Sequence, residues 1–322
     1  MTLPVFGARQ VHAALTPSEA LEAVRTAFLE HARGAWLMPS KVYVEAPPDG
    51  DFRAMPASGG GYAVLKWVTS FPGNPARGLP TVTGVVLLSD AGNGELLAVL
   101  DAGALTALRT GAAAVLAAET LARPDAGRAG VVGCGVNGTA VARTFVDRGR
   151  DVLLFDMRPG QAETVTAELG AAASAAADLA EVLACDVVAT VTPGREPVLR
   201  RDSLRPGQHV SLMGADGPGK SEIETEELLR TRIVCDEWEQ ASHNGDIARA
   251  VGSGDVGRGD VAELGLVLSG AEIGRRSDSD VTAFDSTGLA VQDLAVARAI
   301  YERYRADSAA EAFAGTTEIE LR

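Results

Sequence analysis

The feature that most constrains the fold is a glycine-rich turn between two apolar runs. Residues 131–138 read Val-Val-Gly-Cys-Gly-Val-Asn-Gly, and Asp156 ends the next apolar run, 18 residues after Gly138. A strand, a tight glycine turn and a helix N-terminus in this order bind the pyrophosphate of a dinucleotide, and an acid at this distance hydrogen-bonds the ribose. The motif alone is weak evidence, because the chain has 36 glycines. Asp156 strengthens the prediction of a nucleotide site.

The segment around this turn alternates strands and helices. Apolar runs predict strands over 129–133, 151–156, 186–191, 208–213, 231–236 and 281–285. Helices are expected over 137–148, 159–169, 176–184 and 222–230, and a final helix from Ser286 to about residue 306. Continuous apolar strands separated by helices predict a parallel sheet covered on both faces, a Rossmann-type doubly wound α/β domain. The alanine tract 171–177 is expected to be helix or small-residue packing, and 243–260 a loop.

The first hundred residues predict a different, α+β arrangement. Thr16, Pro17 and Glu19 indicate a capped helix over 16–33. Strand patterns follow at 41–45, 51–55 and 62–69, and then a hairpin with arms at 82–88 and 96–100. We expect an antiparallel sheet with one covering helix. An alanine-rich helix over 105–122 leads into a break at 123–127, which we take as the domain boundary.

Composition narrows the classes of partner. The formal net charge of −14 argues against a nucleic-acid partner, which needs clustered cations. Residues 1–10 lack a signal-peptide pattern, and no apolar run approaches the roughly 20 residues that span a bilayer. Three widely spaced cysteines, at 134, 185 and 235, fit reduced thiols, and the four histidines show no ligand spacing. We expect a cytoplasmic protein without a metal, acting on a small molecule.

One acid follows a predicted strand at the edge where the cofactor's reactive ring is expected. Asp216 lies in Gly-Ala-Asp-Gly-Pro-Gly-Lys, residues 214–220, just after the strand over 208–213. A turn followed by a capping box of Ser221 and Glu224 explains the glycines and the serine. It does not require both an acid and the base Lys220 on the turn. Asp216 is therefore a candidate functional residue.

Four cations fall in the first predicted domain of this acidic chain: Lys41, Arg53, Lys66 and Arg109. Lys66 interrupts an apolar strand, where a lysine by default faces solvent. Cations that converged would clamp a carboxylate, with arginine donating bidentate hydrogen bonds. The sequence leaves their convergence open.

Seven ordered stretches resemble motifs of one known family. They are residues 52–56, 66–68, 71–75, 78–80, 105–110, 214–220 and 284–290. On these stretches the chain resembles the ornithine cyclodeaminase/mu-crystallin family almost end to end. The Phe-Arg-x-Met-Pro pattern at 52–56 and the stretch 236–243 look most like its archaeal-type alanine dehydrogenase branch.

The resemblance implies a homodimer of two-domain subunits. Residues 1–120 with 305–322 would bind substrate and form the dimer interface, and residues 121–304 would form the NAD(P)-binding domain. By motif match, Asp216 and Lys66 would be catalytic, and Lys41, Arg53, Lys66 and Arg109 would bind substrate. The cyclodeaminases usually have arginine where this chain has Lys41. The positions expected to contact the cofactor are Thr81, Arg109, Thr110, Gly133, Gly135, Val136, Asn137, Gly138, Asp156, Arg158, Thr192, Met213, Lys220 and Ser286.

Several reactions share one chemical core, hydride transfer between NAD and the Cα of an amino acid. Hydrolysis of the resulting imine gives a keto acid and ammonia, whereas attack by a second amine gives a cyclic amino acid. Arg53 would repel the distal ammonium of ornithine or lysine, so we favour alanine dehydrogenase-like chemistry. Ornithine or lysine cyclodeamination, reduction of cyclic ketimines and a mu-crystallin-like ligand-binding role stay as alternatives. Asp156 favours NAD over NADP, although Arg158 would partly offset this preference.

Overall fold

The computed structural model describes residues 2–194 and 196–321, and the chain divides into two compact units. The first contains the residues up to Arg109 and those from Leu289 onward, and the second runs from Thr110 to Gly288. The first division lies inside helix α3 (Ala102–Leu121), whereas the sequence suggested a boundary at the break over 123–127. The final helix α11 (Ala290–Ala306) belongs to the first unit, where it packs on helix α2 (Pro17–Ala32).

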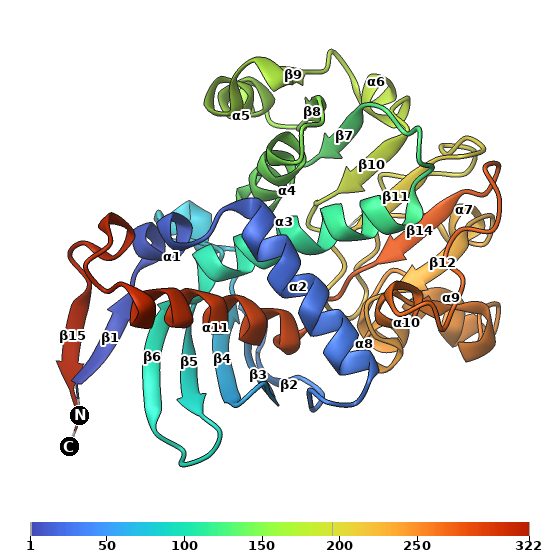
Figure 1. The fold of residues 1–322 in the computed structure, drawn as a ribbon. Coiled ribbons are helices and arrows are strands. Elements are labelled where there is room, and N and C mark those ends of the chain that lie inside the picture. Colours follow the sequence, from blue (N-terminus) through green and yellow to red (C-terminus); the bar gives the residue numbers. More distant parts are fainter. Residues whose placement is uncertain (1, 195, 322) are drawn as a thin grey trace. The chain divides into compact units, whose positions relative to one another are not determined.

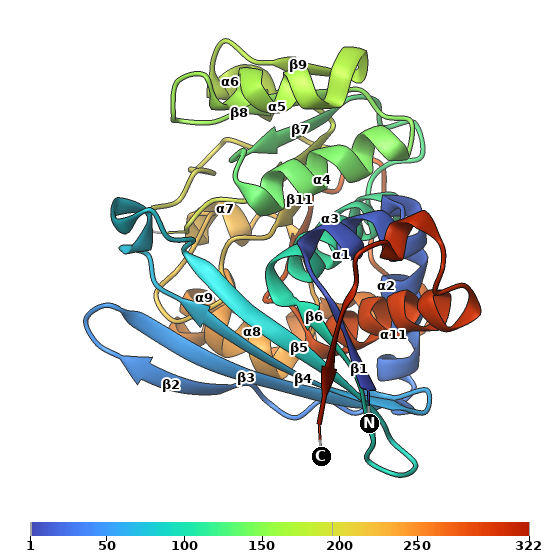
Figure 2. The same ribbon diagram turned by 90° about the vertical axis from the view of Figure 1, so that its left-hand side faces the viewer.

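The first unit is built on a seven-stranded sheet in the order β15-β1-β6-β5-β4-β3-β2. Its strands are β1 (Thr2–Phe6), β2 (Val42–Ala46), β3 (Gly50–Gly59), β4 (Tyr62–Ser70), β5 (Val82–Asp90), β6 (Leu96–Asp101) and β15 (Thr317–Glu320). Neighbours are antiparallel except β1 and β6, which are parallel. The expected antiparallel sheet is therefore present, with two strands from the chain ends added. The tail after residue 306 packs back, since β15 pairs with β1 at the edge visible in Figure 2.

Helices cover one face of this sheet. Helix α11 packs on β3, β4 and β5, and α2 packs on α11, as Figure 1 shows. The short helix α1 (Ala8–Ala14) lies beside β6. The capping box of α2 is confirmed: Glu19 N donates to Thr16 Oγ1, and Thr16 N donates to Glu19 Oε2. One covering helix was expected, and the structure has two, because α11 returns from the far end of the chain.

The second unit contains an eight-stranded parallel sheet, in the order β13-β12-β14-β11-β10-β7-β8-β9. Its strands are β7 (Ala129–Val132), β8 (Val152–Phe155), β9 (Ala173–Ala175), β10 (Val187–Thr190), β11 (His209–Leu212), β12 (Arg232–Cys235), β13 (Ala262–Glu263) and β14 (Thr282–Asp285). The expected doubly wound fold is confirmed. The order of the strands reverses between β7 and β10, which is where such sheets bind ligands at their carboxyl edge.

The helices of this unit correct several expectations. They are α4 (Val136–Asp147), α5 (Gln161–Leu169), α6 (Leu179–Leu183), α7 (Thr225–Leu228), α8 (Trp238–Asn244), α9 (Ala248–Ser253) and α10 (Leu264–Leu268). The helix expected over 222–230 shrinks to α7, because residues 221–223 pair with other segments instead. The expected loop at 243–260 holds α9, and the alanine tract forms the edge strand β9. None of the helices in the described part of the chain is long and apolar enough to span a bilayer.

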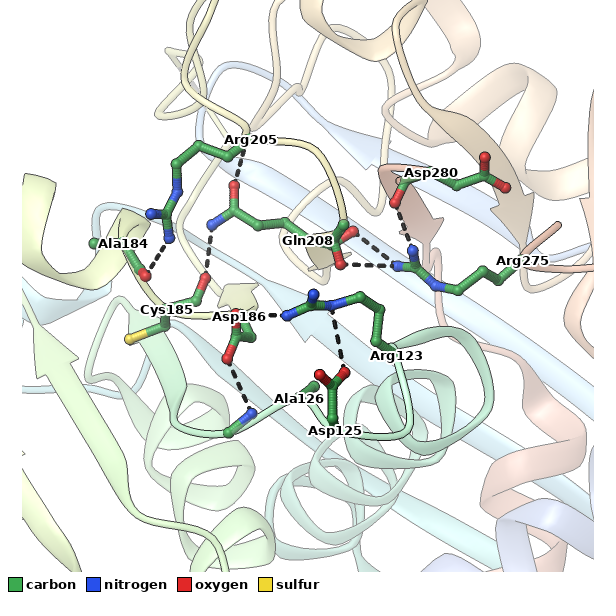
Figure 3. A network of polar contacts seen from close by, with 12 residues as sticks. Arg123, Asp125, Ala126, Ala184, Cys185, Asp186, Arg205, Gln208, Arg275 and Asp280 are labelled. Carbon is green, nitrogen blue, oxygen red and sulfur yellow. Dashed lines mark hydrogen bonds and ion pairs between the residues drawn. The ribbon is translucent and has the colours of Figure 1, made fainter. Parts of the chain in front are cut away.

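A network of arginine contacts ties together the amino ends of the parallel strands (Figure 3). Arg275 Nε donates to Leu121 O at 2.7 Å, where α3 ends. Its Nη2 donates to Gln208 O at 3.0 Å, just before β11, and its Nη1 to Asp280 O, just before β14. One guanidinium thus satisfies backbone carbonyls of three segments that are distant in the sequence. Asp186, immediately before β10, accepts hydrogen bonds from Arg123 Nη2 and from Gly127 N.

We expect the Arg275→Met variant to lose about 2–4 kcal/mol of unfolding free energy, because several carbonyls lose their donor while the apolar stem is kept. Urea unfolding followed by circular dichroism measures this loss. The exposed neighbour supplies the control, since Arg276→Met should stay within about 0.5 kcal/mol of the parent protein. Equal stability of the two variants would show that the Arg275 contacts contribute nothing.

Candidate active site

The predicted glycine turn connects β7 to α4. Gly133 has φ +95°, and a Cβ added to Gly138 would lie 1.7 Å from Gly133 O. The chain itself therefore needs both glycines, one for its backbone conformation and one for close packing. Gly135 differs: its φ is −76°, and an added Cβ would meet no atom within 4 Å. No contact within residues 2–194 and 196–321 explains Gly135, whereas a ligand that approaches the backbone at the N-terminus of α4 would.

Asp156 follows β8 and holds this turn. Its Oδ2 accepts from Cys134 N at 2.7 Å, and Arg158 donates to it from N at 2.8 Å and from Nη2 at 2.9 Å. Burial raises the pKa of Asp156, but the hydrogen bonds from Arg158 and Cys134 outweigh burial and lower the pKa to about 2. The acid is thus a carboxylate at neutral pH, and the exposed Arg158 side chain is paired with it rather than with solvent anions.

A buried acid that the sequence analysis did not single out joins the ends of β10 and β11. Glu222 is fully buried and accepts from Thr192 N at 2.6 Å and Thr192 Oγ1 at 2.8 Å. It also accepts from Met213 N at 2.9 Å and Gly214 N at 2.7 Å. Two predicted cofactor positions, Thr192 and Met213, are therefore brought together by one carboxylate. Burial raises the pKa of Glu222 above its usual value.

Asp216 lies on the loop that Glu222 anchors. Lys220 Nζ donates to Asp216 Oδ1, and both side chains are about one-third exposed, at 38% for Asp216 and 33% for Lys220. The capping box expected at Ser221 does not form, because Glu224 N donates to Leu199 O instead, and Ser221 Oγ directs its one proton to Ile223 O or to the buried Asp246. The acid and base on this turn thus form an ion pair that is open to solvent. Such a pair can exchange a proton with a ligand.

The remaining positions of this unit that were predicted to contact a cofactor lie in three places. Ser286 follows β14, and its Oγ donates to the buried Asp236, which also accepts from Thr287 N at 2.7 Å and Gly288 N at 2.8 Å. Val136 and Asn137 begin α4, with Val136 72% exposed. Thr110 is buried on α3, and its Oγ1 has no hydrogen-bond partner among the described residues.

In the first unit, Lys66 points to the covered face of the sheet rather than to solvent. It lies on β4 between Met55 of β3 and Val86 of β5, and its side chain is 2% exposed. The default expectation for a strand lysine is therefore wrong here. Lys66 Nζ donates to Asp293 Oδ1 of α11 at 3.0 Å and to Thr106 Oγ1 of α3 at 2.6 Å.

Arg109 joins the same cluster. Its Nε lies 3.6 Å from Asp293 Oδ1, is buried, and makes no hydrogen bond among the described residues. Two of the four predicted cations therefore converge on one buried acid. Burial lowers the pKa of Lys66 to about 8, with Asp293 opposing this change and Arg109 and Arg53 adding to it.

Arg53 faces the same covered side, from β3. Asp51 pairs with it at 2.6 Å, and its guanidinium lies 5.4 Å from the centre of the Tyr43 ring. Arg53 was expected to be an uncompensated cation, whereas Asp51 neutralises it. Lys41 is half-buried immediately before β2, and Thr81 is half-buried immediately before β5; their predicted roles stay predictions.

Three acids were missed as site residues: Glu222, Asp236 and Asp293. Each has a weak signal in the sequence: the acid stands beside apolar residues, and apolar neighbours suggest that the segment is buried. Asp293 lies three residues after the family motif at 284–290, in the run Ala290-Val291-Gln292-Asp293-Leu294-Ala295. Only the tertiary contacts show that these acids are buried and which groups they hold.

A model of the ornithine cyclodeaminase/mu-crystallin family matches residues 5–308. The chain belongs to this family. An alanine dehydrogenase of Archaeoglobus fulgidus is 44% identical over 91% of this chain and 92% of its own length.

Solved structures of family members are similar throughout. An archaeal alanine dehydrogenase dimer with bound NAD superposes with a TM-score of 0.92, at 40% identity and with 100% of both chains covered. A Thermococcus litoralis Delta(1)-pyrroline-2-carboxylate reductase in complex with NADH and L-proline gives 0.89, at 28% identity, covering 95% of this chain and 98% of that one. The ornithine cyclodeaminase/mu-crystallin fold is thus shared over the whole length.

The glycine turn of this family member allows a matched pair of variants. We expect Gly135→Ala to fold with an unfolding free energy within about 1 kcal/mol of the parent protein, yet to bind NADH at least about 10-fold more weakly, because its methyl group would occupy the space a pyrophosphate needs. Gly138→Ala should be destabilised without any ligand, since its Cβ would collide with Gly133 O.

NADH fluorescence titration and thermal unfolding of the apoprotein separate these effects. Gly252→Ala, on α9, is the control, because its Cβ would also meet nothing within 4 Å and it lies away from the turn. Unchanged NADH affinity in Gly135→Ala would contradict the assignment of this turn to the cofactor.

Proposed function

We propose that the protein is an NAD-dependent oxidoreductase that converts a small L-amino acid, such as alanine, to its keto acid and ammonia, and catalyses the reverse reaction. The observation that carries this proposal is the buried cluster of Lys66, Arg109 and Asp293. Its two cations and one anion leave a net charge of +1, which matches one substrate carboxylate. The similarity to the Archaeoglobus fulgidus alanine dehydrogenase over almost the whole chain supports the choice of substrate.

The protein's own residues would perform three tasks. Lys66 and Arg109, with Arg53 and Lys41, hold the carboxylate and so fix the Cα and its amine. Asp216 takes a proton from the amine and, after the imine forms, directs water to its carbon. The paired Lys220 holds the Asp216 side chain in place until the substrate enters. NAD, when bound, accepts the hydride from Cα.

The cofactor fits the second unit on two observations. Gly135 leaves the helix N-terminus open, and the buried Thr110 hydroxyl has no hydrogen-bond partner in the described part of the chain. The pyrophosphate would lie on the glycine turn, and Asp156 would accept from the ribose. A carboxylate with a pKa of about 2 repels the 2′-phosphate of NADP, so NAD is favoured. The residues that would contact it are Thr81, Arg109, Thr110, Gly133, Gly135, Val136, Asn137, Gly138, Asp156, Arg158, Thr192, Met213, Lys220 and Ser286.

Cyclodeamination is the second candidate, and Asp51 is the observation that favours it. A cyclodeaminase must accept a long side chain that ends in an ammonium, and Asp51 places a carboxylate beside Arg53. The pair is neutral as a whole, so it offers the distal ammonium no net attraction. A short, uncharged side chain therefore remains the better match.

Purified protein should form NADH from NAD with L-alanine, and it should consume NADH with pyruvate and ammonia. The absorbance of the reduced nicotinamide measures both reactions. Ornithine, lysine and cyclic imines complete the panel. Release of proline from ornithine without alanine oxidation would establish the cyclodeaminase reaction instead. Binding of NADH without turnover on any of these substrates would indicate a ligand-binding protein.

Within this function, Asp216→Asn should lower kcat at least about 100-fold and leave NADH affinity within about twofold, because proton transfer by a positioned group contributes factors of this size. Steady-state kinetics with alanine and NADH fluorescence titration measure the two quantities. Glu226→Gln removes an exposed acid on α7 and should leave both unchanged. An active Asp216→Asn variant would remove Asp216 from the mechanism.

We also propose that the protein forms a homodimer through the face of the first sheet that the helices do not cover. Val42, Ala54, Trp67 and Val85 are paired neighbours in β2, β3, β4 and β5 and so form one row across this face. Val42 is 56% exposed and Trp67 39%, so the row is an apolar surface of the kind that protein interfaces bury. The alanine dehydrogenase that this chain resembles was solved as a dimer.

Trp67→Glu should convert the dimer to a monomer, because it places a charge in the centre of this row. Sedimentation velocity measures the mass of the particle. The control is Leu229→Glu, which changes an exposed leucine of the second unit (45% exposed) and should stay dimeric. A dimeric Trp67→Glu variant, or a monomeric parent protein, would contradict the proposed interface.

A further inference from the structure

Helix α11 buries one acid against the sheet of the first unit. Asp293 has no exposed surface, and its neighbours in α11, among them Val291 and Leu294, are buried apolar residues. Burying an ionised carboxylate costs several kcal/mol unless a cation and hydrogen bonds compensate it. An acid at this position therefore needs a purpose beyond packing.

The contacts of Asp293 determine how Lys66 is held. Asp293 Oδ1 and Thr106 Oγ1 accept two of the three N–H groups of Lys66. Thr106 Oγ1 donates its own proton to Ala102 O at 2.6 Å, so towards Lys66 the hydroxyl acts only as an acceptor. Lys66 keeps one N–H group without a partner among the described residues. The ammonium is thus oriented, with one donor left for a ligand.

The charged groups around Lys66 lie on three of the neighbouring elements. Helix α11 contributes Asp293, α3 contributes Arg109, and β3 contributes Arg53, which Asp51 pairs; on β5 the neighbour is the apolar Val86. Burial and the two arginines favour neutral Lys66, and Asp293 is the charge that opposes them. The pKa of about 8 keeps most of Lys66 protonated at neutral pH.

We propose that Asp293 is a positioning residue that holds Lys66 oriented and protonated, so that the clamp presents one net positive charge to a ligand carboxylate. For an amino-acid carboxylate this rests on the proposed function. Without Asp293, Lys66 loses its proton at a lower pH, and the clamp then binds a carboxylate only under more acidic conditions. The acid acts through Lys66 and does not itself contact the carboxylate.

The test measures binding of propionate, a carboxylate that cannot be oxidised at an amine, to the NADH-bound protein by calorimetry between pH 6 and 9. For the parent protein, affinity should fall as pH rises through about 8, because binding requires protonated Lys66. In Asp293→Asn the midpoint should lie at least about one pH unit lower, which gives about 5-fold weaker binding at pH 8 and about 10-fold at pH 9. At pH 6 the variant should bind at least as well as the parent protein.

Controls separate this role from a structural one. Glu302→Gln removes an exposed acid on the same helix, paired with Arg298, and should leave the midpoint unchanged. In a Lys66→Arg background, Asp293→Asn should shift no midpoint, since a guanidinium does not titrate in this range. If Asp293→Asn does not fold, Asp293→Glu decides: its charge should keep the alkaline midpoint, and a midpoint lowered by one unit would overturn the proposal.

Three further outcomes separate the role of Asp293 from the proposed function. Weaker binding of Asp293→Asn at every pH with an unchanged midpoint would mean a purely structural role and would refute the proposal. A parent protein that oxidises alanine but binds propionate with no alkaline fall in affinity would refute the role of Asp293 and leave the proposed function intact. A parent protein that shows this fall, and its shift in Asp293→Asn, without turning over any amino acid would support the role while the proposed function fails.

Discussion

Backbone N–H groups that emerge at the carboxyl edge of the parallel sheet need acceptors, because the strands end there and their ladder partners are gone. Buried carboxylates supply these acceptors. Asp156 holds the glycine turn, Glu222 joins the loops after β10 and β11, and Asp236 holds the segment after β14. Every loop of this unit that carries a predicted cofactor position is held by one of these carboxylates; the remaining predicted position, Thr110, lies on helix α3. The positions proposed to bind a dinucleotide depend on these acids.

The two edges of the same sheet are stabilised by side chains of opposite charge. At the amino edge, Arg275 donates to carbonyl oxygens that precede the strands, and that edge carries no predicted site residue. At the carboxyl edge, buried acids crowd one another: burial and the charge of Glu222 raise the pKa of Asp246 to about 7. The raised pKa values of Glu222, Asp246 and Asp285 favour protonated acids, which limits the negative charge buried behind these loops.

The first unit uses a buried acid for a different purpose. Two cations and one anion lie under α11 on the covered face of the first sheet, which also carries the Arg53–Asp51 pair, and the charges of the three do not cancel. Such an arrangement is expensive for folding alone and is explained by a ligand that brings the missing negative charge. Arg53 is paired with Asp51, so it can donate hydrogen bonds to a ligand carboxylate but adds no net charge to the cluster.

The sequence by itself determined the doubly wound domain, its glycine turn, the acid at Asp156 and the family, because periodicity, turn glycines and ordered motifs are local signals. It did not determine that Lys66 is buried, that α11 joins the first unit, or that residues 221–223 pair with a buried acid instead of beginning a helix. Each of these depends on segments far apart in the chain: Lys66 meets Asp293 across 227 residues. A strand lysine looks the same in sequence whether it faces solvent or a counter-ion. Only the tertiary structure, by burying the strand face under α11, decided between the two.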